Sequence, residues 1–101
     1  MDADFFVERV KEELADAKTY IKTAIEIRTM NPNWSKQFAT MSADELSHAT
    51  SLFKMYEDYY NAFTKGYSEV PKYLSDQKKD LVDHYSECSA EIKFMHEMYG
   101  K

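Results

Sequence analysis

The sequence predicts an all-α fold, in which a long antiparallel helical hairpin is followed by a third helix. Two glycines and two prolines occur among the 101 residues; Pro32 lies in "TMNPNW", Gly66 and Pro71 lie in "TKGYSEVPKY", and Gly100 follows the third periodic segment. Glycine and proline mark turns between periodic segments. Between these turns, apolar residues recur every three or four positions, which is the period of an amphipathic helix. We therefore expect helices over about residues 3–29, 33–65 and 72–99, in a single domain of residues 1–101.

The charge balance excludes several classes of partner. There are 18 acidic and 13 basic residues, the net charge is -5, and no block of lysine or arginine occurs. Such a surface repels nucleic acid and anionic membranes. The start of the chain, "MDADFFVERVKEEL", resembles neither a signal peptide nor a transit peptide, and no apolar run approaches the length of a membrane span. We therefore expect a cytoplasmic protein that binds neither nucleic acid nor membrane.

The first segment is predicted to bury one apolar stripe that contains a single charged residue, Glu13. Its neighbour Glu12 lies on the opposite, solvent-facing side together with Arg9, so the two glutamates are not equivalent. The stripe steps by four and three residues and consists of Phe6, Val10, Glu13, Ala17, Tyr20, Ala24 and Ile27.

The second segment repeats this feature with two polar residues, Glu45 and His48, in an otherwise apolar series. The predicted buried series is Trp34, Phe38, Met41, Glu45, His48, Leu52, Met55, Tyr59 and Ala62. Because the turn at "NPN" makes the two helices antiparallel, Glu13 and Glu45 lie about 22–25 Å and 17–18 Å from it, at a rise of about 1.5 Å per residue. Glu13, Glu45 and His48 are therefore expected to converge.

A buried cluster of this composition requires a compensating cation. Burial of unpaired carboxylates costs several kcal/mol. Two glutamates and one histidine suit a hard or borderline divalent ion such as iron or manganese, and zinc is an alternative. Cys88 is the only cysteine, so neither an internal disulfide nor a thiolate zinc site is expected.

Three further residues are candidates for the same site. Glu91 interrupts the apolar face of the third segment and is a candidate ligand from that helix. Tyr20 and Tyr59 fall on the stripes that face the site, where a phenol can orient a metal ligand by hydrogen bonding.

The motifs resemble those of ferritin-like di-iron carboxylate proteins. "ELADAKTY" (Glu13 to Tyr20) followed by "ADELSHATSLF" (Ala43 to Phe53) is similar to the first half of rubrerythrin-type proteins, with a Glu-x6-Tyr helix and then a Glu-x-x-His helix. The resemblance covers residues 10 to 55. It implies a four-helix bundle with two irons, in which Glu13 is a terminal ligand, Glu45 a bridging carboxylate and His48 a nitrogen ligand. It also implies oxidation of ferrous iron, or reduction of peroxide, with these three residues as the catalytic set.

The sequence contains one Glu-x-x-His motif, whereas a complete di-iron set uses two. Three helical segments leave no fourth helix, so we expect a homodimer or higher homo-oligomer in which a two-fold axis duplicates Glu13, Glu45 and His48. Encapsulated ferritins, which are short ferritin-like chains that build their site at a subunit interface, resemble this arrangement.

Alternatives remain open at this stage. "SADE" is also a capping-box pattern, in which Ser42 would start a helix and Glu45 would fold back onto its amide. His48 can be a core histidine bonded to Tyr20 or to a backbone carbonyl, and Glu91 can belong to an intrahelical pair. The alternative function is a non-enzymatic helical assembly protein, phage-encoded or regulatory, without metal. A structural zinc or manganese site without turnover is intermediate between the two.

Overall fold

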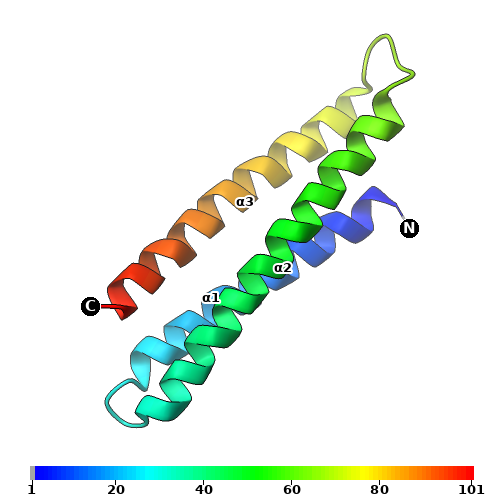
Figure 1. The fold of residues 1–101 in the computed structure, drawn as a ribbon. Helices are drawn as coiled ribbons and strands as arrows, with labels where there is room; N and C mark the ends of the chain where they lie inside the picture. The colour runs from blue at the N-terminus through cyan, green and yellow to red at the C-terminus, as the bar shows by residue number, and fades with distance from the viewer. Residues whose placement is uncertain (1) are drawn as a thin grey trace.

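The computed structural model describes residues 2–101, which form three helices and no strand (Figure 1). Helix α1 spans Ala3–Glu26, α2 spans Pro32–Thr64 and α3 spans Lys72–Tyr99. The molecule is elongated, with extents of 57 × 21 × 15 Å. The all-α fold, the antiparallel hairpin and the third helix are confirmed, although α1 ends before the predicted residue 29. Within the described residues, no helix has an apolar stretch long enough to cross a membrane.

Side-chain caps fix the starts of the first two helices. Asp2 accepts a hydrogen bond from the backbone N–H of Phe5, and Asn31 accepts one from that of Trp34. Pro32 occupies the first turn of α2, where its missing N–H costs nothing. The tight connection over residues 27–31 therefore sets the antiparallel course of the hairpin on which the candidate site lies.

Small residues form the seam between α1 and α2. Ser35 and Ser42 are fully buried, and their hydroxyls donate to the backbone carbonyls of Ala24 and Ala17 at 2.5 and 2.6 Å. The two donors are seven residues apart, as are the two acceptors, so the contact repeats after two helical turns. Ala49 continues the same line and is also fully buried. Short side chains at these positions allow the two backbones to approach closely.

The prediction that Trp34, Met41, Met55 and Ala62 lie in the core is wrong. The first three side chains are 61%, 41% and 53% exposed, and Ala62 is exposed as well. The buried line of α2 lies one residue further along the chain, and one residue rotates a helix face by about 100°. An apolarity pattern misses this line because two of its members are serines, whose polar groups are satisfied by carbonyls of α1. The buried line is Ser35, Ser42, Ala49 and Tyr56.

Helix α3 contacts both other helices through apolar and polar side chains. Leu81 and Ile92 are its fully buried apolar side chains. Salt bridges join it to α1, including Lys18–Glu91 at 2.9 Å and Lys11–Asp80 at 3.3 Å. Hydrogen bonds join it to α2, including Thr50–Tyr85 at 2.7 Å and Ser42–His96 at 3.0 Å. Figure 1 shows α3 along one side of the hairpin.

Candidate metal centre

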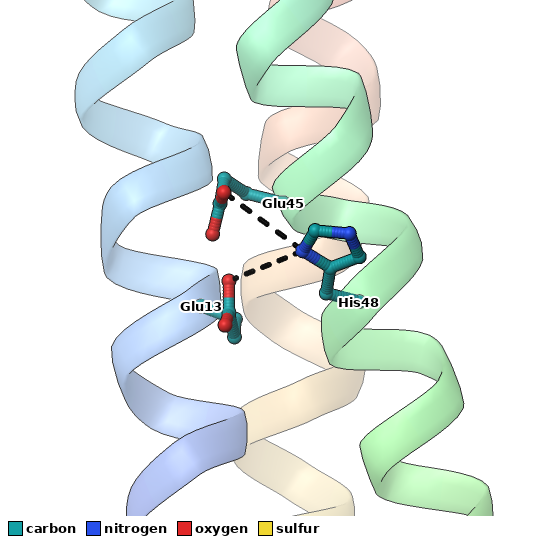
Figure 2. Close-up of side chains that lie close together, drawn as sticks. All are labelled: Glu13, Glu45 and His48. Atoms are coloured by element: carbon teal, nitrogen blue, oxygen red, sulfur yellow. Dashed lines mark ion pairs between the residues drawn. The ribbon is translucent and has the colours of Figure 1, made fainter.

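Glu13, Glu45 and His48 converge between α1 and α2, as the sequence predicts (Figure 2). Glu13 projects from α1, whereas Glu45 and His48 project from successive turns of α2. The spacing of three residues places the last two side chains on one face. In Figure 2 the three side chains lie between α1 and α2, and α3 passes behind them. The cluster therefore lies on the flank of the hairpin away from α3.

The separations within the triad suit an ion better than direct hydrogen bonds. His48 Nδ1 lies 3.8 Å from Glu13 Oε2 and 3.8 Å from Glu45 Oε1, beyond hydrogen-bond length. One ligand atom from each residue lies within 4.8 Å of the others. Donors bound at about 2.1 Å from a common ion are separated by at most about 4.2 Å. A shift of less than about 1 Å would therefore bring all three donors within bonding distance of one cation.

Glu13 supplies the strongest indication of a ligand. Its side chain is only 9% exposed, and Oε1 accepts a hydrogen bond from Arg9 Nη2 at 2.7 Å. Its other oxygen, Oε2, is buried without any hydrogen-bond partner in residues 2–101, and it is the oxygen nearest His48. A buried acceptor without a partner costs about 1–3 kcal/mol. A cation next to Oε2 would remove that cost.

The structure excludes two of the alternative interpretations. Helix α2 begins at Pro32, so Ser42 is an interior residue and does not cap a helix. The His48 side chain is 60% exposed and makes no hydrogen bond to Tyr20 or to a backbone carbonyl within the described chain, so it is not a core histidine. The Glu45 side chain is 24% exposed and lies between the buried Glu13 and the open His48. The cluster is therefore closed on the side of α1 and open on the side of the imidazole.

The other candidate residues lie apart from the triad. Glu91 forms an ion pair with Lys18 at the contact between α1 and α3. The Tyr20 ring lies against Phe38, with centroids 6.0 Å apart, and the Tyr59 ring lies between Phe6 and Phe63. Neither tyrosine donates a hydrogen bond to the three ligand candidates in residues 2–101. Glu13, Glu45 and His48 are thus the residues that the fold brings together.

Sequence reasoning missed Arg9. The sequence placed it on the solvent-facing side of α1, but its guanidinium bridges Glu12 Oε2 at 2.6 Å and Glu13 Oε1 at 2.7 Å. The spacing of four residues between Arg9 and Glu13 is the signal that indicates this contact, because residues i and i+4 are neighbours on a helix. The long, flexible arginine side chain lets a partly exposed residue reach the buried carboxylate one turn further along the helix.

Burial shifts the pKa values of three titratable groups outside the triad, and it raises that of Tyr56 to about 12. Burial lowers the pKa of His96, whose Nε2 lies 3.0 Å from Ser42 Oγ. Because the Ser42 hydroxyl donates to Ala17, we infer that His96 Nε2–H donates to Ser42. Burial also raises the pKa of the Cys88 thiol, which lies 3.6 Å from His84 Nε2. Cys88 is therefore a protonated thiol at neutral pH and not an activated nucleophile.

Comparisons with known proteins assign no relative to this chain. No protein-family model matches the chain, and neither the curated proteins nor the solved structures contain a match.

Proposed function

We propose that Glu13, Glu45 and His48 bind a divalent transition-metal ion, and that the protein is a ferritin-like iron-binding protein. The observation that carries this proposal is the buried Glu13 Oε2, which faces His48 and has no partner among residues 2–101. Carboxylate and imidazole donors suit iron and manganese, and zinc also accepts this set. The resemblance of the Glu13 and Glu45–His48 motifs to those of rubrerythrin-type proteins favours iron.

A second copy of the chain would complete the site. We define the outer line of α2 as Trp34, Met41, His48 and Met55, which follow one another every seven residues and are all exposed. This line places the imidazole among large apolar side chains on the open flank. Packing of the outer lines of two chains around a two-fold axis would cover these apolar groups. It would also bring two sets of Glu13, Glu45 and His48 together.

Such a paired site would support oxidation of ferrous iron as substrate. Two Fe(II) ions give two electrons to one O₂, which takes up two protons and becomes H₂O₂. With peroxide as oxidant, the same two electrons and two protons convert H₂O₂ into two molecules of water. The carboxylates would hold the ions close enough for both electrons to reach one oxidant, and the imidazole would tune their potential.

The exposed apolar groups of the outer line also favour a second function, that of a helical assembly protein without metal. Apolar side chains that stay exposed along one helix face are typical of protein interaction surfaces. In that case Glu13 would be neutralised by Arg9 alone, and Glu45 and His48 would contribute only polar contacts that select the register of assembly.

Metal analysis separates these functions. We expect protein purified without chelator to contain about one iron per chain, and ferrous salt followed by oxygen to produce ferric absorbance. The double variant with Glu45→Leu and His48→Ala should keep its helical content and lose metal affinity by roughly 100-fold or more, because two of three donors are gone.

The matched control changes the same residue types on α3. Glu91→Leu with His84→Ala removes one carboxylate and one imidazole outside the triad, so metal affinity should stay as in the unaltered chain. Metal-free protein whose melting temperature is unchanged by added iron, manganese or zinc would refute metal binding and favour the assembly function.

A further inference from the structure

Arg9 connects the candidate site to the solvent-facing side of α1. One guanidinium nitrogen contacts Glu12, whose side chain is 60% exposed, and the other contacts Glu13, whose side chain is 9% exposed. Because Arg9 is itself 42% exposed, it can leave Glu13 without leaving water. Its contact with Glu12 gives it a second anionic partner on the outside of the helix.

The contact with Arg9 also makes the two oxygens of the Glu13 carboxylate different from each other. Arg9 occupies Oε1 at 2.7 Å, whereas Oε2 remains unpaired and faces His48 and Glu45. The carboxylate is thereby held with one oxygen aimed into the triad. As long as Arg9 stays in place, Glu13 can offer an incoming ion only one of its oxygens.

We propose that Arg9 is the resident counter-ion of the site, which stabilises Glu13 in the metal-free protein and competes with the incoming metal ion. This inference rests on the proposed metal binding and adds a positioning residue that sets its strength. The guanidinium carries a positive charge that an incoming cation meets as long as Arg9 stays beside Glu13. Arg9 must therefore either remain beside the bound ion and repel it, or move towards Glu12.

Competition between Arg9 and the metal ion predicts that a substitution of Arg9 lowers the stability of the metal-free protein and raises its affinity for metal. Arg9→Gln removes the positive charge but keeps a side chain that can donate a hydrogen bond. The metal-free protein should melt at a lower temperature, because the buried Glu13 carboxylate loses its compensating charge. Affinity for Mn²⁺ should rise by roughly tenfold, the scale of repulsion between a single and a double positive charge several ångströms apart in a well-screened site.

Titration calorimetry with Mn²⁺, which is stable in air, measures this affinity in the chain of residues 1–101. Arg9→Lys keeps the charge and should bind Mn²⁺ nearly as the unaltered chain does. Lys18→Gln also removes one positive charge from α1, but this charge is paired with Glu91 beside α3, so its effect on affinity should stay below about threefold. A tenfold gain confined to Arg9→Gln is the expected result.

Each other result overturns a stated part of the argument. If the unaltered chain binds Mn²⁺ and a folded Arg9→Gln binds it equally or more weakly, the counter-ion role of Arg9 is wrong and metal binding stands. If neither chain binds Mn²⁺, Co²⁺ or Zn²⁺, both the proposed metal binding and the counter-ion role of Arg9 are wrong. If Arg9→Gln does not fold alone, excess Mn²⁺ should restore its helical circular dichroism, and a chain that stays unfolded refutes the role.

Discussion

At the scale of single residues, Glu12 and Glu13 show how one step along a helix changes the chemistry of the same side chain. Glu12 is exposed and pairs with Arg9 in water, where such a pair contributes little to stability. Glu13 is buried and keeps one oxygen without a partner in the described chain. The difference between the two was predictable from the helical period, because a step of about 100° takes Glu13 onto the apolar stripe.

His96 makes stability depend on pH. Burial lowers its pKa in the folded protein below the ordinary value of about 6.5, so the unfolded chain binds more protons between these two pKa values. The contribution of neutral His96 to the free energy of unfolding is therefore complete above about pH 6.5. It is lost as the pH falls towards the pKa of His96 in the folded protein. We expect the urea midpoint to decrease between about pH 7.5 and 5.5, and His96→Gln to reduce this decrease.

The control for this prediction is His84→Gln, which removes a histidine of the same helix that contacts Cys88 instead of Ser42. It should leave the pH dependence of the urea midpoint closer to that of the unaltered chain. Equal slopes for the His96 variant and the unaltered chain would show that another group causes the loss of stability in acid.

At the scale of elements, the hairpin is organised by the small residues of its seam. Ser35, Ser42 and Ala49 allow α2 to lie close to α1, and the two hydroxyls bond to α1 carbonyls. Each such bond satisfies a buried polar group within the protein, which is why serine is tolerated where leucine is normally expected. The bulky residues beside this line are consequently turned outward.

Ala49→Leu tests the position of the seam. Ala49 is fully buried in the core cluster, so three added carbon atoms have no space and should destabilise the protein by about 1–3 kcal/mol. Ala62→Leu, at an exposed site of the same helix, should change stability by less than about 0.5 kcal/mol. Both values come from urea unfolding followed by circular dichroism. Equal effects would mean that α2 is rotated from the orientation described.

The sequence predicted the elements better than their orientation. Glycine, proline and the caps at Asp2 and Asn31 place the turns locally, so the helix bounds follow from a few residues. The rotation of α2 depends on which carbonyls of another helix accept its serine hydroxyls, and that is a tertiary contact. The convergence of Glu13, Glu45 and His48 was nevertheless predicted correctly. These long side chains lie beside the seam, and they meet although α2 is rotated from its predicted orientation.

At the scale of the whole molecule, the two flanks of the hairpin differ. Helix α3 covers one flank, whereas the outer line of α2 is exposed on the other. The proposed pairing of two chains would make the flanks more alike, because each exposed hairpin would gain another helical layer. The same pairing would shield Glu45 and His48 from water.

Met55→Lys tests whether the outer line joins two chains. Met55 is exposed and belongs to that line, so a charge there should weaken self-association by about tenfold or more without unfolding the chain. Phe94→Lys is the control, because Phe94 is exposed on α3 outside the outer line. Light scattering over a dilution series reports the mass. An unaltered chain that stays monomeric, or equal effects of both variants, would argue against this interface.

The polar attachment of α3 has a consequence for motion. Ser42–His96, Thr50–Tyr85 and the salt bridges of Lys11 and Lys18 can all exchange their partners for water when α3 moves away. Helix α3 fully buries the apolar side chains of Leu81 and Ile92, whereas α1 fully buries a longer apolar series, Val10, Ala17, Ile21 and Ala24, and water offers no substitute for such contacts. Amide hydrogens of α3 should therefore exchange with deuterium through local opening, while those of the hairpin remain protected.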